Sequence, residues 1–441
     1  MTGFRIAAGR LRAIVFGGVC CLSLAHGAAP AQTCAPHEQR APEARSQRPA
    51  MPGQTRACGV TSPVRFDVSV VAGGFEEAWA VEPLPAGGFL VSEQGGRLRI
   101  VHADGSLASP LGGLPAVDAG GQGGLLDVAL SPAFASDHRV YWSYVEPRAG
   151  GNGTSVARGV LDPARNAVSD VSVVFRAEPA HDGHKHFGSR LAFGPDGLLY
   201  ITLGERGDRA LRAQAQRLDS HLGKVVRIAP DGAAPPDNPF VRTPGARPEI
   251  WTLGHRNVQA AAFDPAGRLW IVEHGTSGGD ELNLLEAGAN YGWPRVAYGE
   301  EYIGLPIPGA ETAREGYRQP VYYWDPVIAP SGAQFYTGDA FPGWRGNLFV
   351  GSLKDRVLVR LVLDGGRVAG EEHLLGARGQ RVRDVRQGAD GTLYVLTGGE
   401  DGELLALTPA REGRASGRPA RGPAPDIRAT ARHATPITGH P

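Results

Sequence analysis

Three histidines lie close together in the stretch HDGHKHFGSRLAFGPDGLLYITLGERGD (residues 181–208). A histidine can act as a general base near neutral pH if a partner fixes its tautomer. The apolar runs RLAF and LLYITL flank the turn sequence GPDG, so we expect a hairpin here. That hairpin would place Glu205 near His186, whereas His181 and His184 lie further out in a loop and are expected to be solvated. His186 and Glu205 are therefore candidates for a base and its orienting carboxylate, and a solvated turn is the alternative.

Basic residues recur later in the chain, at Arg256, Lys354, Arg381 and Arg383. Like charges that cluster without an anion are unfavourable, and arginine forks bind carboxylates or phosphates with two hydrogen bonds. The alternation of a strand would place both arginines of RVR (381–383) on one side. If the four side chains meet, they predict a polyanionic ligand. A solvated basic strand edge is the alternative.

The segment EHGTSGGDELN (273–283) is rich in glycine and carboxylates. Carbonyl and carboxylate oxygens of this kind can bind a hard cation such as Ca²⁺. The segment does not match the EF-hand pattern, and an ordinary flexible turn has the same composition.

A pattern of strand, Gly- or Pro-containing turn and second strand occurs six times. The instances are WAVEPLPAGGFLVSE (79–93), DVALSPAFASDHRVYWSYV (127–145), RLAFGPDGLLYITLG (190–204), AAFDPAGRLWIVEHG (261–275), GAQFYTGDAFPGWRGNLFVGSL (332–353) and DVRQGADGTLYVLTGG (384–399). A single hairpin cannot bury its apolar face, but stacked units can. The repeats predict an all-β fold, a six-bladed propeller with four-stranded antiparallel blades. A β-sandwich or two β domains is the alternative.

In such a propeller, the residues just before each innermost strand would converge around one mouth of the central channel. These positions are polar and differ from blade to blade. They are Glu76, Glu77, Gln122, His186, Arg256, Asn257, residues 329–331, Arg381 and Arg383.

The two ends of the chain differ from its middle. Arg5, Arg10 and Arg12 precede the apolar run AIVFGGVCCLSLA, which predicts a secretory signal peptide over residues 1–32 and a periplasmic or secreted protein. A lead-in follows over residues 33–62, then the propeller over 63–409. Residues 410–441 are rich in Ala, Arg and Pro, and we expect them to be disordered.

Composition limits the partners. The chain has 45 basic and 45 acidic side chains, which offers no electrostatic reason to expect nucleic acid or an anionic membrane surface. No segment after the signal reaches the length of a membrane span. Cys34 and Cys58 could pair in an oxidising compartment, or stay apart.

About residues 63–408 resemble the soluble quinoprotein sugar dehydrogenases that use pyrroloquinoline quinone (PQQ), especially the periplasmic aldose sugar dehydrogenases. The motifs that carry the resemblance are GQGGLLDVALSPAF, HFGSRLAFGPDG, LGHRNVQAAAFDP, EHGTSGGDELNLLEAGANYGWP, WDPVIAPSG, SLK and RVRDV. The family is similar in having a six-bladed fold.

The resemblance implies roles for particular residues. It implies that His186 is the base, that Glu205 orients it and that Arg256 assists catalysis. It further implies cofactor contacts from Gln122, Arg256, Asn257, Lys354, Arg381 and Arg383, a cofactor-linked Ca²⁺ on the carbonyls of Gly275 and Thr276, and a second Ca²⁺ at Glu281 and the Tyr291 carbonyl.

The implied activity is oxidation of an aldose at C1 to a lactone. His186 would take the hydroxyl proton while hydride moves to PQQ, and Ca²⁺ with Arg256 would polarise the quinone. An external acceptor, a quinone or a cytochrome, would take the electrons from a monomer or homodimer. A non-enzymatic binding propeller and a metal-dependent sugar lactonase are the alternatives.

Three positions depart from the glucose-oxidising members of the family. Lys185 stands where an acidic residue precedes the base, Glu205 stands where aspartate is frequent, and Thr276 replaces a proline. These differences bear on substrate preference more than on the chemistry.

Overall fold

The computed structural model describes residues 34–410. The chain divides into two compact units, residues 1–35 and residues 36–441, and every strand and helix of the described part lies in the second. The predicted signal peptide and nearly all of the predicted C-terminal tail therefore lie outside the described residues. Cys34 and Cys58, whose state the sequence left open, are each disulfide-bonded.

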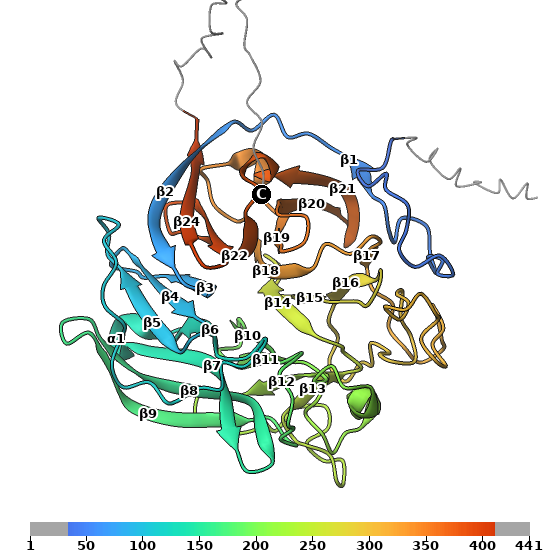
Figure 1. Ribbon diagram of the computed structural model, residues 1–441, viewed down its shortest axis with the longest axis horizontal. Coiled ribbons are helices and arrows are strands. Elements are labelled where there is room, and N and C mark those ends of the chain that lie inside the picture. The colour runs from blue at the N-terminus through green and yellow to red at the C-terminus, as the bar shows by residue number, and fades with distance from the viewer. Residues whose placement is uncertain (1–33, 411–441) are drawn as a thin grey trace, which may run out of the picture. The chain divides into compact units, whose positions relative to one another are not determined.

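The second unit contains six sheets arranged radially, each antiparallel apart from one added strand, so the predicted six-bladed propeller is confirmed (Figure 1). The innermost strands are β3, β6, β10, β14, β18 and β22, and each contacts the innermost strand of the next blade. In blade order, the strands are β3 (Ala78–Pro83), β4 (Phe89–Glu93) and β5 (Arg97–Val101); β6 (Leu125–Leu130), β7 (Arg139–Arg148), β8 (Gly151–Asp162) and β9 (Ala167–Arg176); β10 (Gly188–Phe193), β11 (Leu199–Leu203), β12 (Lys224–Ile228) and β13 (Ile250–Leu253); β14 (Val258–Phe263), β15 (Leu269–Glu273), β16 (Asp280–Leu284) and β17 (Tyr322–Trp324); β18 (Pro330–Phe335), β19 (Leu348–Ser352), β20 (Leu358–Asp364) and β21 (Arg367–Leu374); and β22 (Arg381–Gln387), β23 (Leu393–Gly398) and β24 (Gly402–Pro409).

Two blades do not have the four strands that the sequence predicted. The blade of β3, β4 and β5 has three strands, and β1 (Cys58–Gly59) adds a fifth, parallel strand beside β21. The ring closes because β2 (Phe66–Phe75), from the N-terminal side, pairs antiparallel with β24 at the C-terminal side. This pairing covers the edge that an open ring would expose.

The few helices are short and lie in the connections. They are α1 (Phe134–Asp137), η1 (Arg209–Gln216), η2 (Pro342–Trp344) and η3 (Gly376–Arg378). Asp208 caps η1 by accepting a hydrogen bond from the amide of Ala210. Within the described residues, no helix has the length and hydropathy needed to cross a membrane.

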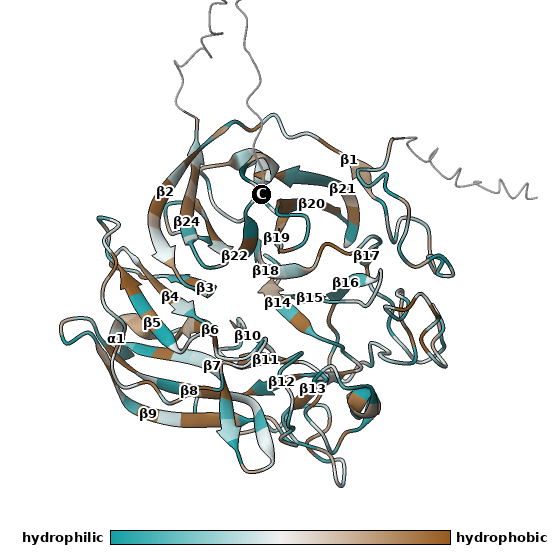
Figure 2. Ribbon diagram, in the orientation of Figure 1, coloured by the Kyte–Doolittle hydropathy of each residue, from teal (hydrophilic) through white to brown (hydrophobic). Residues whose placement is uncertain are grey.

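The core lies between neighbouring blades. Hydrophobic and hydrophilic residues alternate along many of the strands, so each sheet presents apolar side chains to the next (Figure 2). For example, the rings of Trp270 on β15 and Phe335 on β18 lie 6.0 Å apart, and those of Tyr141 on β7 and Phe193 on β10 lie 5.1 Å apart. Stacking of blades thus buries faces that no single hairpin could cover.

Each of the six innermost strands has a register shift within its first four residues. A bulge redirects the side chains next to it, and such bulges are frequent beside active sites. Here all six occur at the same end of the channel, where the polar residues predicted from the sequence are found.

Buried charges occupy the middle of the channel. Arg190 Nη1 lies 2.8 Å from Asp127 Oδ1, and Arg386 Nη1 lies 2.8 Å from Asp384 Oδ1. Asp127 also accepts a hydrogen bond from the amide of Leu191 on the next blade. The network therefore joins innermost strands from different blades below the polar mouth.

Candidate active site

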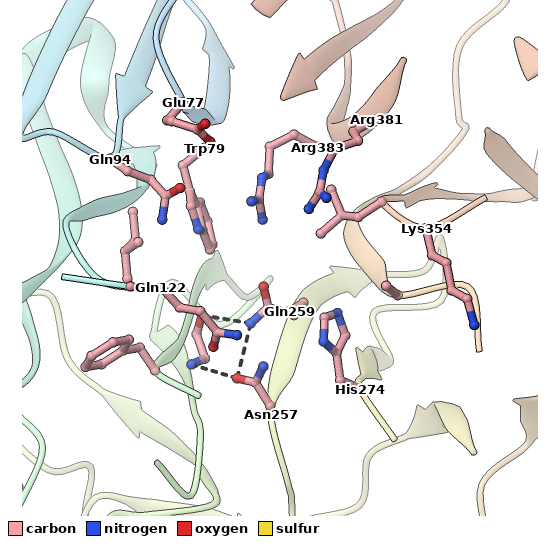
Figure 3. Close-up of a pocket in the computed structure, with 16 residues that line it drawn as sticks. Glu77, Trp79, Gln94, Gln122, Asn257, Gln259, His274, Lys354, Arg381 and Arg383 are labelled. Atoms are coloured by element: carbon pink, nitrogen blue, oxygen red, sulfur yellow. Dashed lines mark hydrogen bonds between the residues drawn. The ribbon is translucent and has the colours of Figure 1, made fainter. Parts of the chain in front are cut away.

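A cavity of about 440 Å³ opens at the mouth where the innermost strands begin (Figure 3). Residues from every blade line it. Of the predicted mouth, it includes Glu77, Gln122, Asn257, Ala329, Arg381 and Arg383, whereas Glu76, His186 and Arg256 are not among its lining residues. The lining residues are Glu77, Trp79, Gln94, Gly121, Gln122, Leu126, Phe187, Gly188, Asn257, Gln259, His274, Ala329, Leu353, Lys354, Arg381 and Arg383.

His186 precedes β10 and forms the hydrogen bond that the hairpin predicted. Its Nδ1 atom lies 2.7 Å from Oε1 of Glu205, whose side chain is 1% exposed. Oε1 also accepts a hydrogen bond from the amide of Gly207, and the amide of His186 donates to Oε1 of Gln122. With Nδ1–H donating to the carboxylate, Nε2 keeps the lone pair that a general base needs.

The surroundings of His186 favour its neutral form. Burial lowers the pKa of His186, and the nearby charge of Arg256 lowers it further, whereas Glu205 opposes both effects. The imidazole is therefore neutral at neutral pH and available to accept a proton.

Arg256 lines a second, smaller cavity and lies close enough to His186 for its charge to act on that ring. Its Nη1 donates to the carbonyl of His274 at 3.1 Å, and its Nη2 donates to the hydroxyl of Tyr302 at 3.4 Å. Its amide donates to Glu273, and its buried Nε has no hydrogen-bond partner within residues 34–410. A guanidinium held in this way leaves a donor available next to the proposed base.

Side-chain amides form the floor of the cavity. Oδ1 of Asn257 accepts hydrogen bonds from the amide of Gly188 and from Nε2 of Gln259, each at 3.2 Å (Figure 3). Gln122 reaches the same floor from another blade.

Arg381 and Arg383 both face the cavity, as the alternation of RVR predicted (Figure 3). Burial, followed by the charges of Arg381 and Arg190, lowers the pKa of Arg383 to about 10. Its Nε is buried without a hydrogen-bond partner among the described residues. The excess positive charge fits an anionic ligand.

Lys354 behaves differently from the two arginines. Its stem lines the cavity, but its ammonium points away from Arg381 and Arg383 and forms an ion pair with Glu43 (Figure 3). The sequence grouped Lys354 with Arg256, Arg381 and Arg383. In the structure its ammonium is paired with Glu43 and points away from the two arginines of β22.

The four predicted metal ligands meet at the smaller cavity, of about 20 Å³. Gly275, Thr276, Glu281 and Tyr291 all line it, together with Arg256. Burial, followed by the carboxylate of Glu273, raises the pKa of Glu281 well above its usual range. Thr276 Oγ1 is buried without a partner in the described part of the chain. Carbonyl and carboxylate oxygens around so small a space suit a hard cation, although residues 34–410 contain no group of three or more His, Cys, Asp or Glu side chains placed to hold a metal.

Several cavity residues were not predicted from the sequence, among them Trp79, Gln94, Gln259 and His274. His274 Nε2 lies 2.6 Å from the carbonyl of Pro330, and burial lowers the pKa of His274 to about 3, so its ring is neutral. The guanidinium of Arg190 lies 4.4 Å from the centre of the Trp79 ring. The motif EHG could have indicated His274, whereas no neighbouring sequence pattern indicates Trp79, Gln94 or Gln259.

The remaining residues of the opening histidine cluster lie in a wider groove beside the site. His181, His184 and Lys185 line this groove with Arg206 and Arg209, not the large cavity. His184 and Lys185 are exposed, as expected for His184.

Comparison with known proteins identifies the family of the propeller. The profile of the Glucose / Sorbosone dehydrogenase family matches residues 75–406. Aldose sugar dehydrogenase YliI of Escherichia coli K12 is 44% identical over 352 residues, which cover 79% of this chain and 94% of that protein. Quinoprotein glucose dehydrogenase B of Acinetobacter calcoaceticus is 29% identical over 356 residues, 64% of this chain and 74% of that one.

Solved structures are similar over the same region. The apo soluble aldose sugar dehydrogenase of Escherichia coli has a TM-score of 0.75 at 44% identity and covers 78% of this chain and 100% of its own. The PQQ-bound aldose sugar dehydrogenase of Streptomyces coelicolor has a TM-score of 0.65 at 33% identity and covers 79% and 99%.

The fold and site define a propeller oxidoreductase. The chain belongs to the glucose/sorbosone dehydrogenase family, and the resemblance to soluble PQQ-dependent sugar dehydrogenases is confirmed.

Proposed function

We propose that this chain oxidises an aldose at C1 to a lactone, using PQQ and Ca²⁺. The observation that carries the proposal is the His186–Glu205 pair, which lies near Arg256 and directly before Phe187 and Gly188, two residues that line the cationic cavity.

The residues present fit PQQ, which carries three carboxylates and an ortho-quinone. Arg381 and Arg383 face the cavity, and the buried Nε of Arg383 has no hydrogen-bond partner within residues 34–410. Gln122 and Asn257 add polar groups on the floor of the cavity (Figure 3). When bound, PQQ supplies the quinone that accepts the electron pair removed from the sugar.

The chain's own contribution is proton transfer and electrostatics. His186 accepts the proton of the anomeric hydroxyl at Nε2, and Glu205 holds the tautomer and stabilises the imidazolium that forms. Arg256 places a fixed positive charge where negative charge develops, in a site already organised for it.

Ca²⁺ would be held at the smaller cavity by the carbonyls of Gly275 and Thr276. Glu281 and the Tyr291 carbonyl would serve the second site that the resemblance implies. A cation next to Glu281 would stabilise its charged form, whose burial is otherwise unfavourable.

The site favours this activity over the two alternatives. A propeller that only binds a ligand does not need a base such as His186, whose tautomer is fixed by Glu205 and whose pKa is lowered by burial and Arg256. A lactonase would need several carboxylate or Asn ligands together in the channel, whereas Asp127 and Asp384 are paired with Arg190 and Arg386, and among the described residues Glu77 and Asn257 are the only Asp, Glu or Asn residues that line the large cavity.

The test is reconstitution. Purified protein receives PQQ and Ca²⁺, its absorbance spectrum is recorded, and dye reduction is measured with a panel of aldoses. Sugar-dependent bleaching of the bound quinone and dye reduction are expected. Protein that binds no PQQ and reduces no dye with any aldose would contradict the proposal. The proposal includes a periplasmic or secreted location and an external quinone or cytochrome as electron acceptor.

A further inference from the structure

The segment that precedes the propeller reaches the loop of the smaller cavity. Glu43 lies outside the region matched by the family profile, which begins at residue 75. Its Oε2 accepts hydrogen bonds from the amides of Gly278, at 3.1 Å, and Val327, at 3.4 Å. Its Oε1 forms the ion pair with Lys354. One carboxylate therefore joins the lead-in, the loop 275–279 and a residue of the large cavity.

The backbone around Glu43 is also fixed. The amide of Glu43 donates to Oδ1 of Asp325 at 2.6 Å, and the amide of Ala44 donates to the same carboxylate. Ala44 is 1% exposed, and a Cβ added at Gly278 would come within 2.9 Å of the Ala44 methyl group. The lead-in thus packs directly against the loop, without space for another side chain.

Ser46 provides a second attachment. Its amide and hydroxyl donate to Oε1 of Glu300 at 2.8 and 2.5 Å. Glu300 in turn exchanges two backbone hydrogen bonds with Ser277, at 2.9 and 3.0 Å. Residues 43–46 therefore hold two consecutive loop residues, Ser277 and Gly278, by independent contacts.

The loop needs such support because its own sequence favours disorder. Gly278 and Gly279 have φ angles of 79° and 78°, which glycine adopts freely but only as one of many conformations. A loop that is already ordered does not lose that conformational freedom when a ligand binds, so its affinity is higher.

We propose that Glu43 is a positioning residue for the metal site. With Ser46, it holds loop 275–279 so that the carbonyls of Gly275 and Thr276 line the smaller cavity, and it thereby sets the affinity for Ca²⁺. This inference rests on the proposed function, because it requires Ca²⁺ to bind at that cavity.

The test is calorimetric titration of chelator-stripped protein with Ca²⁺ alone. Outer contacts to metal ligands change metal affinity by about 10- to 100-fold, so we expect E43A to weaken Ca²⁺ binding by about tenfold or more. S46A should weaken it less, and E43Q, which keeps an acceptor for Gly278, should recover part of the loss. The matched control is R40A, which removes an exposed ion pair between the same segment and Asp355 without touching the loop.

Melting temperatures in chelator separate positioning from general stability. If the inference holds, E43A and R40A melt close together in chelator, and only E43A loses part of the rise caused by Ca²⁺. Equal Ca²⁺ affinity in E43A and wild type would overturn the inference while leaving the proposed function intact. A wild-type protein that binds Ca²⁺ but no PQQ would instead contradict the proposed function and leave the inference standing. If the wild type binds no Ca²⁺ at all, both the inference and the metal part of the proposed function fail.

Discussion

His186 Nδ1 and Glu205 Oε1 lie 2.7 Å apart at the open end of a strand hairpin, His186 before its first strand and Glu205 after its second. The hairpin of β10 and β11 brings them together, and Gly204 between them passes so close to the His186 carbonyl that a Cβ there would lie 2.0 Å from it. The pair is therefore a product of local chain geometry, and its position depends on a glycine.

Replacement of His186 by asparagine should lower kcat by about 10²- to 10⁴-fold, the usual contribution of a general base. PQQ affinity, followed by absorbance, should stay within about threefold of wild type. A large loss of PQQ affinity would instead assign His186 to cofactor binding.

The acid limb of the pH profile should move in opposite directions in two variants. Because burial and Arg256 lower the pKa of His186, wild-type kcat/KM should hold down to pH values below 6.5, the ordinary value, and fall only as His186 becomes protonated. Arg256→Met removes a positive charge, raises the pKa of His186 and shifts the limb to higher pH. Glu205→Gln removes a stabilising carboxylate, lowers that pKa and shifts the limb to lower pH, with a reduced kcat. Lys185 also lowers the pKa of His186, but by less than Arg256 does.

Both shifts can be tested by steady-state rates measured from about pH 4 to about pH 8, the range over which histidines titrate. If the acid limb does not move in either variant, His186 is not the base.

Arg383→Met should weaken PQQ binding by about 10- to 100-fold, because a charge-assisted hydrogen bond contributes about 1.5–3 kcal/mol. The control is Arg378→Met, since Arg378 pairs with Glu403 and does not line the cavity. Equal PQQ affinity in both variants, measured by titration of the absorbance, would remove Arg383 from the cofactor site.

Removal of Ca²⁺ should lower the melting temperature, because a ligand that binds only the native state stabilises it. Glu281→Gln should reduce the rise in melting temperature that Ca²⁺ causes. A protein whose melting temperature in chelator equals that in millimolar Ca²⁺ would have no calcium site of this kind.

Asp127→Ala should lower the free energy of unfolding by about 3–5 kcal/mol, because it removes one of the carboxylates that pair with the buried Arg190 and Arg386 and takes the acceptor from the Leu191 amide. The matched control is Asp162→Ala, whose partner Arg165 is exposed and whose pair contributes about 0–1 kcal/mol. Urea unfolding monitored by tryptophan fluorescence measures both values. A loss under about 1 kcal/mol for Asp127→Ala would show that the channel charges do not stabilise the ring.

The repeated hairpins determined much of this protein from sequence alone. Alternation and turn residues are local properties, so they predicted six blades, the mouth to which the polar residues converge, and the His186–Glu205 contact. The three-stranded first blade was not predicted, because whether an outer strand forms depends on packing and not on the pattern within the hairpin.

Only the tertiary structure decided which charged side chains form ion pairs with one another. Glu43 and Lys354 are 311 residues apart and form an ion pair, while Nε of Arg383 has no hydrogen-bond partner in the part of the chain that the structure describes. The sequence grouped Lys354 with the cavity arginines because charge can be read from residue type, whereas a partner cannot. Trp79, Gln94 and Gln259 were missed for the same reason, since each becomes a site residue only when a different blade faces it across the channel. Strand patterns are set by neighbours along the chain, but the electrostatics of the site are set by neighbours in space.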